Sequence, residues 1–438
     1  MFTRALPIAV AALTTLLLTT ALGAAGCEKL DHEAIDRWSR TSNGPAKLLA
    51  AVARADADPD LSAHAAANLF KREGDREVYA AFAAMPAARR AQVISRLAPR
   101  VWDVARVESE RELPGQAQVA AKDQLVRLRG WADEPTRARI DGYLIDWYCV
   151  ASYEDRAKAG LAGGAAVMRL VGPAAAKKLM AVVNAVITAP GQDRARNRIG
   201  DQLLLGLAAT GHPDAVARVL DIAHMDRGDP TLSTRALAAL YRAYVEPEGF
   251  PAADGEAVAA NLPGLIDVAR DDRIAGQAAD DAVALIRAAG PPRCLVPLVG
   301  MLGAPHANPR FKYVVANNAL RCGGAGAIVD VVRAMPDTGG YAQDQLDRAI
   351  SGEIARMAPR DQALAAARAL LAAPSTLAKW VGIEALGAMK ATEDAPRIAA
   401  LASSRERLAG YWGERAEGRP DPTLGQRARE ISTGLGAK

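Results

Sequence analysis

Five histidines are the side chains in this 438-residue chain best suited to bind a metal ion. None of them belongs to an HExxH motif, which places two imidazoles on one face of a helix, and no Cys-x-x-Cys pair is present. One of them, His212, stands between a glycine and a proline, which favours a solvated or helix-capping role. We therefore expect no metal site and no cofactor. The five are His32, His64, His212, His224 and His306.

Four aspartates are concentrated in one short segment, and paired carboxylates can carry out acid–base chemistry. They are Asp271, Asp272, Asp280 and Asp281. Acid–base chemistry needs a carboxyl group whose pKa is raised, and this requires burial. The four stand among arginines and other polar residues, so the sequence predicts a solvated surface.

Gly323, Gly324 and Gly326 precede the helical segment AIVDVVRAM. The free N–H groups at the start of such a helix can bind phosphate. However, neither GxGxxG nor GxxxxGK is present and no strand precedes the segment, so we interpret it as a turn between helices. A GxSxG nucleophile motif is also absent. We do not expect an enzyme.

The composition predicts an all-α protein. Half of the residues are apolar, only 5% are aromatic, and alanine and leucine, which favour helix, are abundant. Alternating β-branched runs typical of strands are nearly absent. Basic and acidic residues (54 and 50) are interspersed along the chain, which argues against a nucleic-acid partner.

The chain repeats a helix–turn–helix unit, and its clearest copy is RNRIGDQLLLGLAATGHPDAVARVLDIA, residues 196–223. Apolar residues recur at helical spacing on both sides of a corner. In the corner, Gly211 can adopt the left-handed conformation, and Pro213 suits the first position of the next helix. The acidic Asp214 complements the dipole of that helix.

Similar corners recur every 33 to 41 residues. Such a period is typical of a helical solenoid, in which each unit buries its apolar face against its neighbours. The pairs ADDAVALIRAAGPPRCLVPLVGML and AKWVGIEALGAMKATEDAPRIAAL resemble HEAT repeats, and the resemblance extends over residues 31–402. It implies a right-handed α-solenoid of stacked antiparallel helix pairs. The corners stand near Gly172, Gly211, Gly249, Gly290, Gly324, Ala358 and Ala391.

The predicted organisation has four parts. In the second, we expect Pro99 and Pro114 to interrupt the helices of the arginine-rich segment 87–130. The parts are a signal segment (1–26), less regular helical repeats (27–130), a regular array (131–402), and a C-terminal loop with a capping helix (403–438).

Cys294 and Cys322 stand beside the corners of consecutive units. Because the corners of stacked units lie along one edge, their sulfur atoms are expected at similar height on neighbouring repeats. In an oxidising compartment they can form a disulfide. The alternative is a pair of buried thiols. Cys149 is expected to be unpaired and buried.

Aromatic residues cluster between positions 131 and 153. The segment from Ile140 to Tyr148 has the spacing of one buried helical face, so it predicts core. Trp131 and Tyr153 lie off that stripe and are the weak candidates for an interaction surface.

The N-terminus has the layout of a secretory signal: Arg4, a long apolar stretch, and small residues before Cys27. Ala24-Ala25-Gly26-Cys27 resembles a bacterial lipobox, which implies acylation of Cys27. Cleavage after Ala25 and an uncleaved membrane anchor are the alternatives. No other stretch is expected to span a membrane.

Together these features predict an envelope lipoprotein, held by its lipid on the periplasmic or surface side of a bacterial membrane. We expect it to bind a protein or peptide partner on the concave face formed by the second helices of the repeats. The alternatives are a HEAT-like enzyme resembling the lyases that attach bilin pigments, and a purely structural envelope component.

Overall fold

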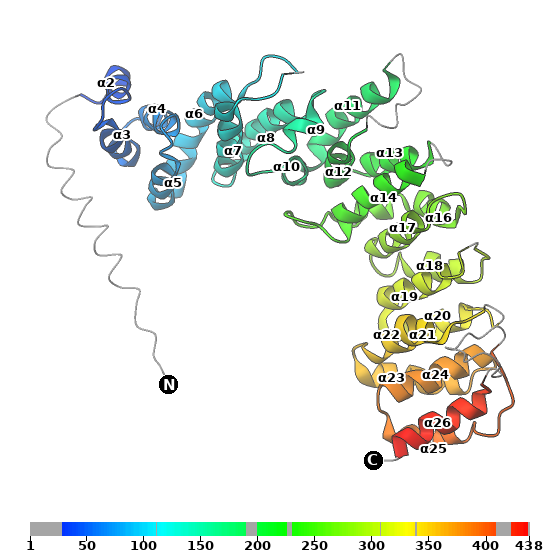
Figure 1. Ribbon diagram of the computed structural model, residues 1–438. Helices are drawn as coiled ribbons and strands as arrows, with labels where there is room; N and C mark the ends of the chain where they lie inside the picture. The colour runs from blue at the N-terminus through cyan, green and yellow to red at the C-terminus, as the bar shows by residue number, and fades with distance from the viewer. Residues whose placement is uncertain are drawn as a thin grey trace, which may run out of the picture. The chain divides into compact units, whose positions relative to one another are not determined.

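The computed structural model describes residues 29–110, 112–189, 199–225, 230–306, 308–337, 340–408 and 422–436. Within these ranges the chain is helical and contains no strand (Figure 1), and an isolated antiparallel bridge joins Arg407 and Thr423. The predicted all-α class is therefore confirmed. The predicted signal segment and Cys27 lie outside the described residues.

The chain forms two compact units, Met1–Val167 and Met168–Lys438. In the first unit, helices that are close in sequence pack on one another: α3 on α4, α4 on α6, α6 on α7, and α7 on α8. The helices of this unit are α2 (His32–Trp38), α3 (Gly44–Ala53), α4 (Pro59–Phe70), α5 (Asp75–Ala84), α6 (Ala87–Ala105), α7 (Gln116–Arg129), α8 (Glu134–Tyr148), α9 (Tyr153–Arg156) and the first half of α10 (Gly164–Val171).

Pro99 lies inside α6 and does not interrupt it, so the predicted break is wrong. A proline within a helix removes one backbone hydrogen bond and costs about 3 kcal/mol. In α6 this cost is offset by a buried apolar face that continues on both sides of the proline, from Val93 to Val101. The helix ends at Ala105.

The second unit is a regular stack of helix pairs. Its helices are α11 (Ala176–Thr188), α12 (Asp201–Ala209), α13 (Pro213–His224), α14 (Pro230–Tyr244), α15 (Glu256–Ala259), α16 (Leu262–Arg270), α17 (Gly276–Ala288), α18 (Leu295–Leu302), α19 (Phe311–Gly323), α20 (Ile328–Ala334), α21 (Gln343–Leu346), α22 (Gly352–Ala355), α23 (Arg360–Leu371), α24 (Thr376–Ala388), α25 (Ala395–Ala399) and α26 (Leu424–Gly436). Short 3₁₀ segments are η1 (Gly172–Ala175), η3 (Gly324–Ala327) and η5 (Thr392–Asp394), and η4 (Asp347–Ser351) is a π-helical turn.

Within this unit, the first helices of successive pairs form one continuous row. In that row α12 packs on α14, α14 on α17, α17 on α19, α19 on η4, η4 on α24, and α24 on α26 (Figure 1). The second helices α13 and α16 pack on each other, as do α18 with α20 and α20 with α23. This arrangement is a HEAT-like α-solenoid, as predicted.

The predicted glycine corners have the conformation that the sequence implies. A positive φ admits glycine with little strain and disfavours other residues. After the Gly211 corner, the side chain of His212 caps α13 by accepting a hydrogen bond from the backbone N–H of Asp214 at 3.1 Å. The corner glycines with positive φ are Gly172, Gly211, Gly249, Gly290 and Gly324.

Polar contacts also join consecutive first helices. The guanidinium of Arg287 donates to the side-chain oxygen of Asn318 at 2.9 Å, and the amide of Asn317 donates to the carbonyl of Ala349 at 2.9 Å. Arg321 pairs with Glu353 at 3.1 Å. The partners are 31 or 32 residues apart, close to one repeat, so these contacts fix the register of the stack.

One further stretch within the described residues, Gly164–Thr188, is long and apolar enough to cross a membrane, with a mean hydropathy of 1.5. The expectation that the N-terminal segment alone has these properties is therefore wrong. In the structure the stretch forms α10, η1 and α11, with Leu179 and Val183 buried.

Candidate functional site

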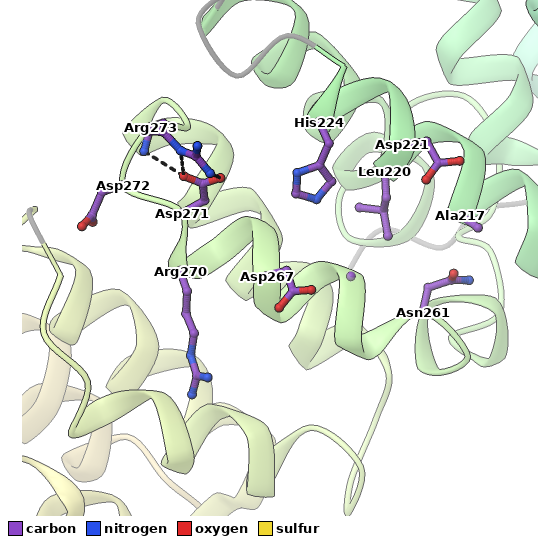
Figure 2. Close-up of a pocket in the computed structure, with 11 residues that line it drawn as sticks. Ala217, Leu220, Asp221, His224, Asn261, Asp267, Arg270, Asp271, Asp272 and Arg273 are labelled. Carbon is purple, nitrogen blue, oxygen red and sulfur yellow. Dashed lines mark hydrogen bonds and ion pairs between the residues drawn. The ribbon is translucent and has the colours of Figure 1, made fainter.

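A cavity of about 830 Å³ opens between α13, α16 and the loop that follows α16 (Figure 2). Both helices are second helices of consecutive pairs. On each of them the lining residues recur every three or four positions, which places them on one helical face. The lining residues are Ala217, Leu220, Asp221, His224, Asn261, Gly264, Asp267, Arg270, Asp271, Asp272 and Arg273.

The floor of the cavity depends on a close approach of the two helices. A β-carbon at Gly264 would lie 3.2 Å from the Leu220 side chain, so glycine lets α16 come near α13. The amide of Asn261 donates to the carbonyls of Pro213 and Ala257, both at 2.9 Å. These contacts tie the start of α16 to the start of α13.

The charge of the lining is negative. It holds four carboxylates and two guanidinium groups, and both guanidinium groups are already engaged. Arg273 donates to both oxygens of Asp271 at 2.8 and 2.9 Å, and Arg270 donates to the carbonyl of Gly300 at 3.2 Å. Among the described residues Asp267 has no hydrogen-bond or ion-pair partner. Asp267 is therefore a carboxylate of the lining that no described cation neutralises.

Asp221 and His224 face the cavity from α13, opposite Asp267 on α16 (Figure 2). Asp221 is 68% exposed and lies 3.7 Å from Arg218, a distance at which an exposed ion pair contributes little. The cavity thus offers carboxylates from both helices to a ligand that enters between them.

Asp272 lies beside His306 at the rim of the cavity. The Nδ1 atom of His306 accepts a hydrogen bond from the backbone N–H of Asn308 at 3.0 Å, so the neutral ring carries its proton on Nε2. That nitrogen lies 3.5 Å from a carboxylate oxygen of Asp272. The ring of His306 stacks on Phe311 with centroids 3.9 Å apart, which fixes its orientation.

Of the four aspartates, Asp272 is exposed as the sequence predicts, whereas Asp271 and Asp280 are half-buried and Asp281 is buried. Asp281 is 6% exposed and accepts a hydrogen bond from Gln277 at 2.8 Å. Burial raises the pKa of Asp280, and the neighbouring Asp281 raises it further. The prediction is wrong for these two because α17 packs between α14, α16 and α19, which the apolar pattern does not reveal.

Two histidines of the first unit lie close together, although their spacing in the sequence does not indicate this. The rings of His32 and His64 lie 5.0 Å apart, and His64 Nε2 is 2.7 Å from Asp36. Arg100 donates to both oxygens of Asp60 at 2.9 and 3.0 Å, so this cluster ties α2, α4 and α6 together. In the part of the chain that the structure describes, no group of three His, Cys, Asp or Glu side chains is arranged to hold a metal ion.

Cys294 and Cys322 form a disulfide in the structure, with Cα atoms 6.2 Å apart. Cys294 is the N-cap residue of α18, and Cys322 lies in the last turn of α19. The bond therefore joins the second helix of one pair to the first helix of the next. Cys149 is buried, at 3% exposure.

The aromatic residues belong mostly to the core. Tyr153 is 1% exposed, so its prediction as a surface candidate is wrong: its ring packs 6.2 Å from that of Tyr148. Trp131 is half-buried against Tyr79 and Phe82, at ring distances of 5.8 and 6.2 Å. The predicted core stripe on α8 is confirmed for Ile140, Leu144, Trp147 and Tyr148, which are buried, while Tyr143 of the same stripe is half-buried and stacks on Trp102.

No family model and no curated protein matches the chain. Among solved structures, the chain is similar to human deoxyhypusine hydroxylase in complex with glycerol, at 16% identity and a TM-score of 0.23. The match covers 78% of this chain and 96% of that one.

Proposed function

We propose that the chain is a protein-binding solenoid that receives cationic side chains of a partner in the cavity between α13 and α16. The observation that carries this proposal is Asp267, a lining carboxylate with no partner among the described residues, in a lining where both guanidinium groups are engaged. A lysine or arginine entering the cavity would supply the missing positive charge.

The chemistry of the lining favours a protein segment over a small apolar ligand. Small-molecule sites are lined mainly by hydrophobic and aromatic side chains. In this cavity Leu220 and Ala217 supply the apolar side chains, and charged or polar groups supply most of the rest. Such a surface attracts a partner by charge and orients it by ion pairs, which is how polar protein interfaces gain specificity.

The location of the cavity also supports a role in binding a partner protein. It lies on two consecutive second helices of a stack, a surface that continues along the repeats and can hold an extended partner segment. We further propose that acylation of Cys27 holds this surface at a membrane. Ala24-Ala25-Gly26-Cys27 supports this, and stable anchoring would need more than one acyl chain.

The test is a binding titration of the purified chain with a fluorescent peptide of alternating lysine and alanine, compared with a matched glutamate peptide. We expect the lysine peptide to bind more tightly, and binding to weaken as salt is added. The double variant Asp221→Asn/Asp267→Asn should weaken binding about tenfold, the loss of about 1.4 kcal/mol.

The matched control is Asp330→Asn, an exposed aspartate on α20 outside the cavity. It removes one negative charge without touching the lining, so it should leave the affinity unchanged. Equal affinities of the wild type and the double variant, or equal binding of the lysine and glutamate peptides, would rule out the proposed role of the cavity.

A further inference from the structure

The loop between α9 and α10 presents an exposed leucine on a rigid support. Leu161 is 83% exposed, yet the backbone that carries it is tightly held. One oxygen of the Asp123 carboxylate accepts a hydrogen bond from the N–H of Leu161 at 2.8 Å, and the other accepts one from the N–H of Ala162 at 3.1 Å. The position of Leu161 is therefore fixed relative to α7.

A buried lysine also fixes the backbone of this loop. The Lys122 side chain is fully buried, and its ammonium donates to the carbonyls of Ala159 and Ala162 at 3.0 and 2.9 Å and to Asp123 at 2.6 Å. An ammonium has three donors, so all of them are satisfied. Burying a lysine is unfavourable unless such partners are present, and two of these three partners are loop carbonyls.

Close packing leaves the loop little freedom. Gly160 has a φ of +83°, and a β-carbon there would lie 2.5 Å from Asp123 and 2.8 Å from Val119. The hydroxyl of Tyr148 donates to the carbonyl of Ala162 at 2.7 Å. The loop is thus preorganised, and a preorganised anchor loses little conformational entropy when it binds a partner.

A groove of about 390 Å³ lies beside this leucine. Its apolar wall is made by Pro114, Val119, Ala120 and Leu161. Leu113, which precedes Pro114 in the chain, is 61% exposed. An exposed leucine on a rigid loop, lining a groove with further apolar residues, is typical of a surface that meets a partner.

The charged side chains that line the groove are both acidic. They are Asp123, which already holds the loop, and Asp75, which accepts hydrogen bonds from the neutral amide of Gln124 at 3.1 and 3.2 Å. The segment that precedes Pro114 adds the exposed Glu110 and Glu112, whose carboxylates interact with the guanidinium of Arg156. The apolar groove therefore has an acidic surround.

We propose that Leu161 and this groove dock a segment of a partner protein in which an apolar side chain stands next to a lysine or arginine. The apolar side chain would pack against Leu161 and Val119, and the cation would pair with Asp75. An anionic membrane surface attracts basic patches, so the acidic surround favours a protein partner over a lipid surface. This surface lies in the first unit and is independent of the acidic cavity in the second.

The test is a selection of random phage-displayed peptides on the purified chain, with counter-selection on Leu161→Ser. Because Leu161 is exposed, the substitution should leave the unfolding midpoint unchanged. We expect the enriched peptides to share an apolar residue beside lysine or arginine, and to bind Leu161→Ser at least about tenfold more weakly. Asp75→Asn should weaken binding of the same peptides and reduce its salt dependence.

The matched control is Val296→Ser, which removes another strongly exposed apolar side chain, at 78% exposure, in the other unit. It should leave peptide binding unchanged. The proposal is overturned if no peptide distinguishes the wild type from Leu161→Ser, or if the enriched peptides are acidic. It is equally overturned if Leu161→Ser instead abolishes sedimentation with vesicles of phosphatidylethanolamine and phosphatidylglycerol.

Discussion

The guanidinium of Arg427 in α26 holds the carboxylate of Glu384 in α24 in a buried, two-point ion pair. Glu384 is 5% exposed, and the second contact measures 2.9 Å. Next to the pair, Ile431 packs so near Gly387 that a β-carbon there would lie 2.9 Å away. The helix α26 therefore packs on α24 as the next member of the row of first helices.

Removing one partner of this pair should loosen the C-terminal end of the stack. Arg427→Met leaves the Glu384 carboxylate buried without its counter-charge, and such a loss costs about 3 kcal/mol. We expect a lower unfolding midpoint and faster hydrogen exchange in α24 and α26. The double variant Glu384→Gln/Arg427→Met should recover part of the loss; if it is as unstable as the sum of the single variants, the two residues do not act as a pair.

A pH-dependent contribution to stability is expected from Asp347 in the π-helical turn η4. Burial and the neighbouring carboxylate of Glu384 raise the pKa of Asp347 to about 6, from an ordinary value of 3.8, although Arg427 opposes the shift. The folded state therefore holds this proton more firmly than the unfolded state. The resulting stabilisation is complete below the ordinary pKa and is lost as the pH rises through about 6.

Asp347→Asn should remove this dependence and make the protein more stable than the wild type above about pH 7. Denaturant unfolding of both proteins across the range from pH 4 to pH 8 measures the difference. Asp330→Asn is the control, because Asp330 is an exposed aspartate on α20 that does not contribute to the raised pKa of Asp347. A wild type that gains stability relative to Asp347→Asn as the pH rises would contradict the raised pKa.

The disulfide between Cys294 and Cys322 should stabilise the second unit. Its partners are 28 positions apart, and closing a loop of that length contributes about 3.6 kcal/mol in the chain-entropy model. We expect Cys294→Ala/Cys322→Ala to lower the unfolding midpoint, and reduction to lower that of the wild type but not that of the variant. Mass spectrometry of the protein without reduction checks the bond directly, and two alkylated thiols at these positions would disprove it.

Acylation of Cys27 predicts a specific change in fractionation. Cells given an alkyne-bearing fatty acid should yield a labelled wild type in the membrane fraction, and Cys27→Ser should lose the label. The mass of the mature N-terminus distinguishes the alternatives, since cleavage after Ala25 leaves Gly26 as the first residue. An unlabelled protein that begins at Gly26 would contradict the lipid anchor.

The sequence predicts the turns between helices better than it predicts which charged side chains are buried. Gly211 and Pro213 act locally, through a left-handed φ and a helix start, so their roles are legible from the chain itself. Lys122 is different, because its burial depends on carbonyls 37 and 40 residues away. Nothing in its neighbourhood along the chain distinguishes it from a solvated lysine.

The sequence does not reveal the acidic cavity, for the same reason. His224 and Asp267 stand on helices whose existence was predicted, but the gap between those helices depends on the approach permitted at Gly264. The sequence shows the aspartates after α16 as a cluster, and their predicted exposure to solvent is wrong where α17 packs against α14, α16 and α19. Helical periodicity predicts which face of a helix is apolar. It does not predict which charged side chains become buried when that face packs.

The rigidity of the loop that carries Leu161 can be tested with two neighbouring glycines. At Gly160 an alanine would need a φ of +83° and would meet Asp123, whereas at Gly163 its β-carbon would find its nearest neighbour at an ordinary 3.5 Å. Gly160→Ala should therefore destabilise the first unit by about 1–3 kcal/mol, and Gly163→Ala should change its stability little. Hydrogen exchange at the amides of Leu161 and Ala162 reports on the loop itself, since both donate to Asp123. Those amides should exchange much faster in Gly160→Ala alone, with Leu161 still present but no longer fixed; equal exchange in the two variants would show that Asp123 and Lys122 do not hold the loop.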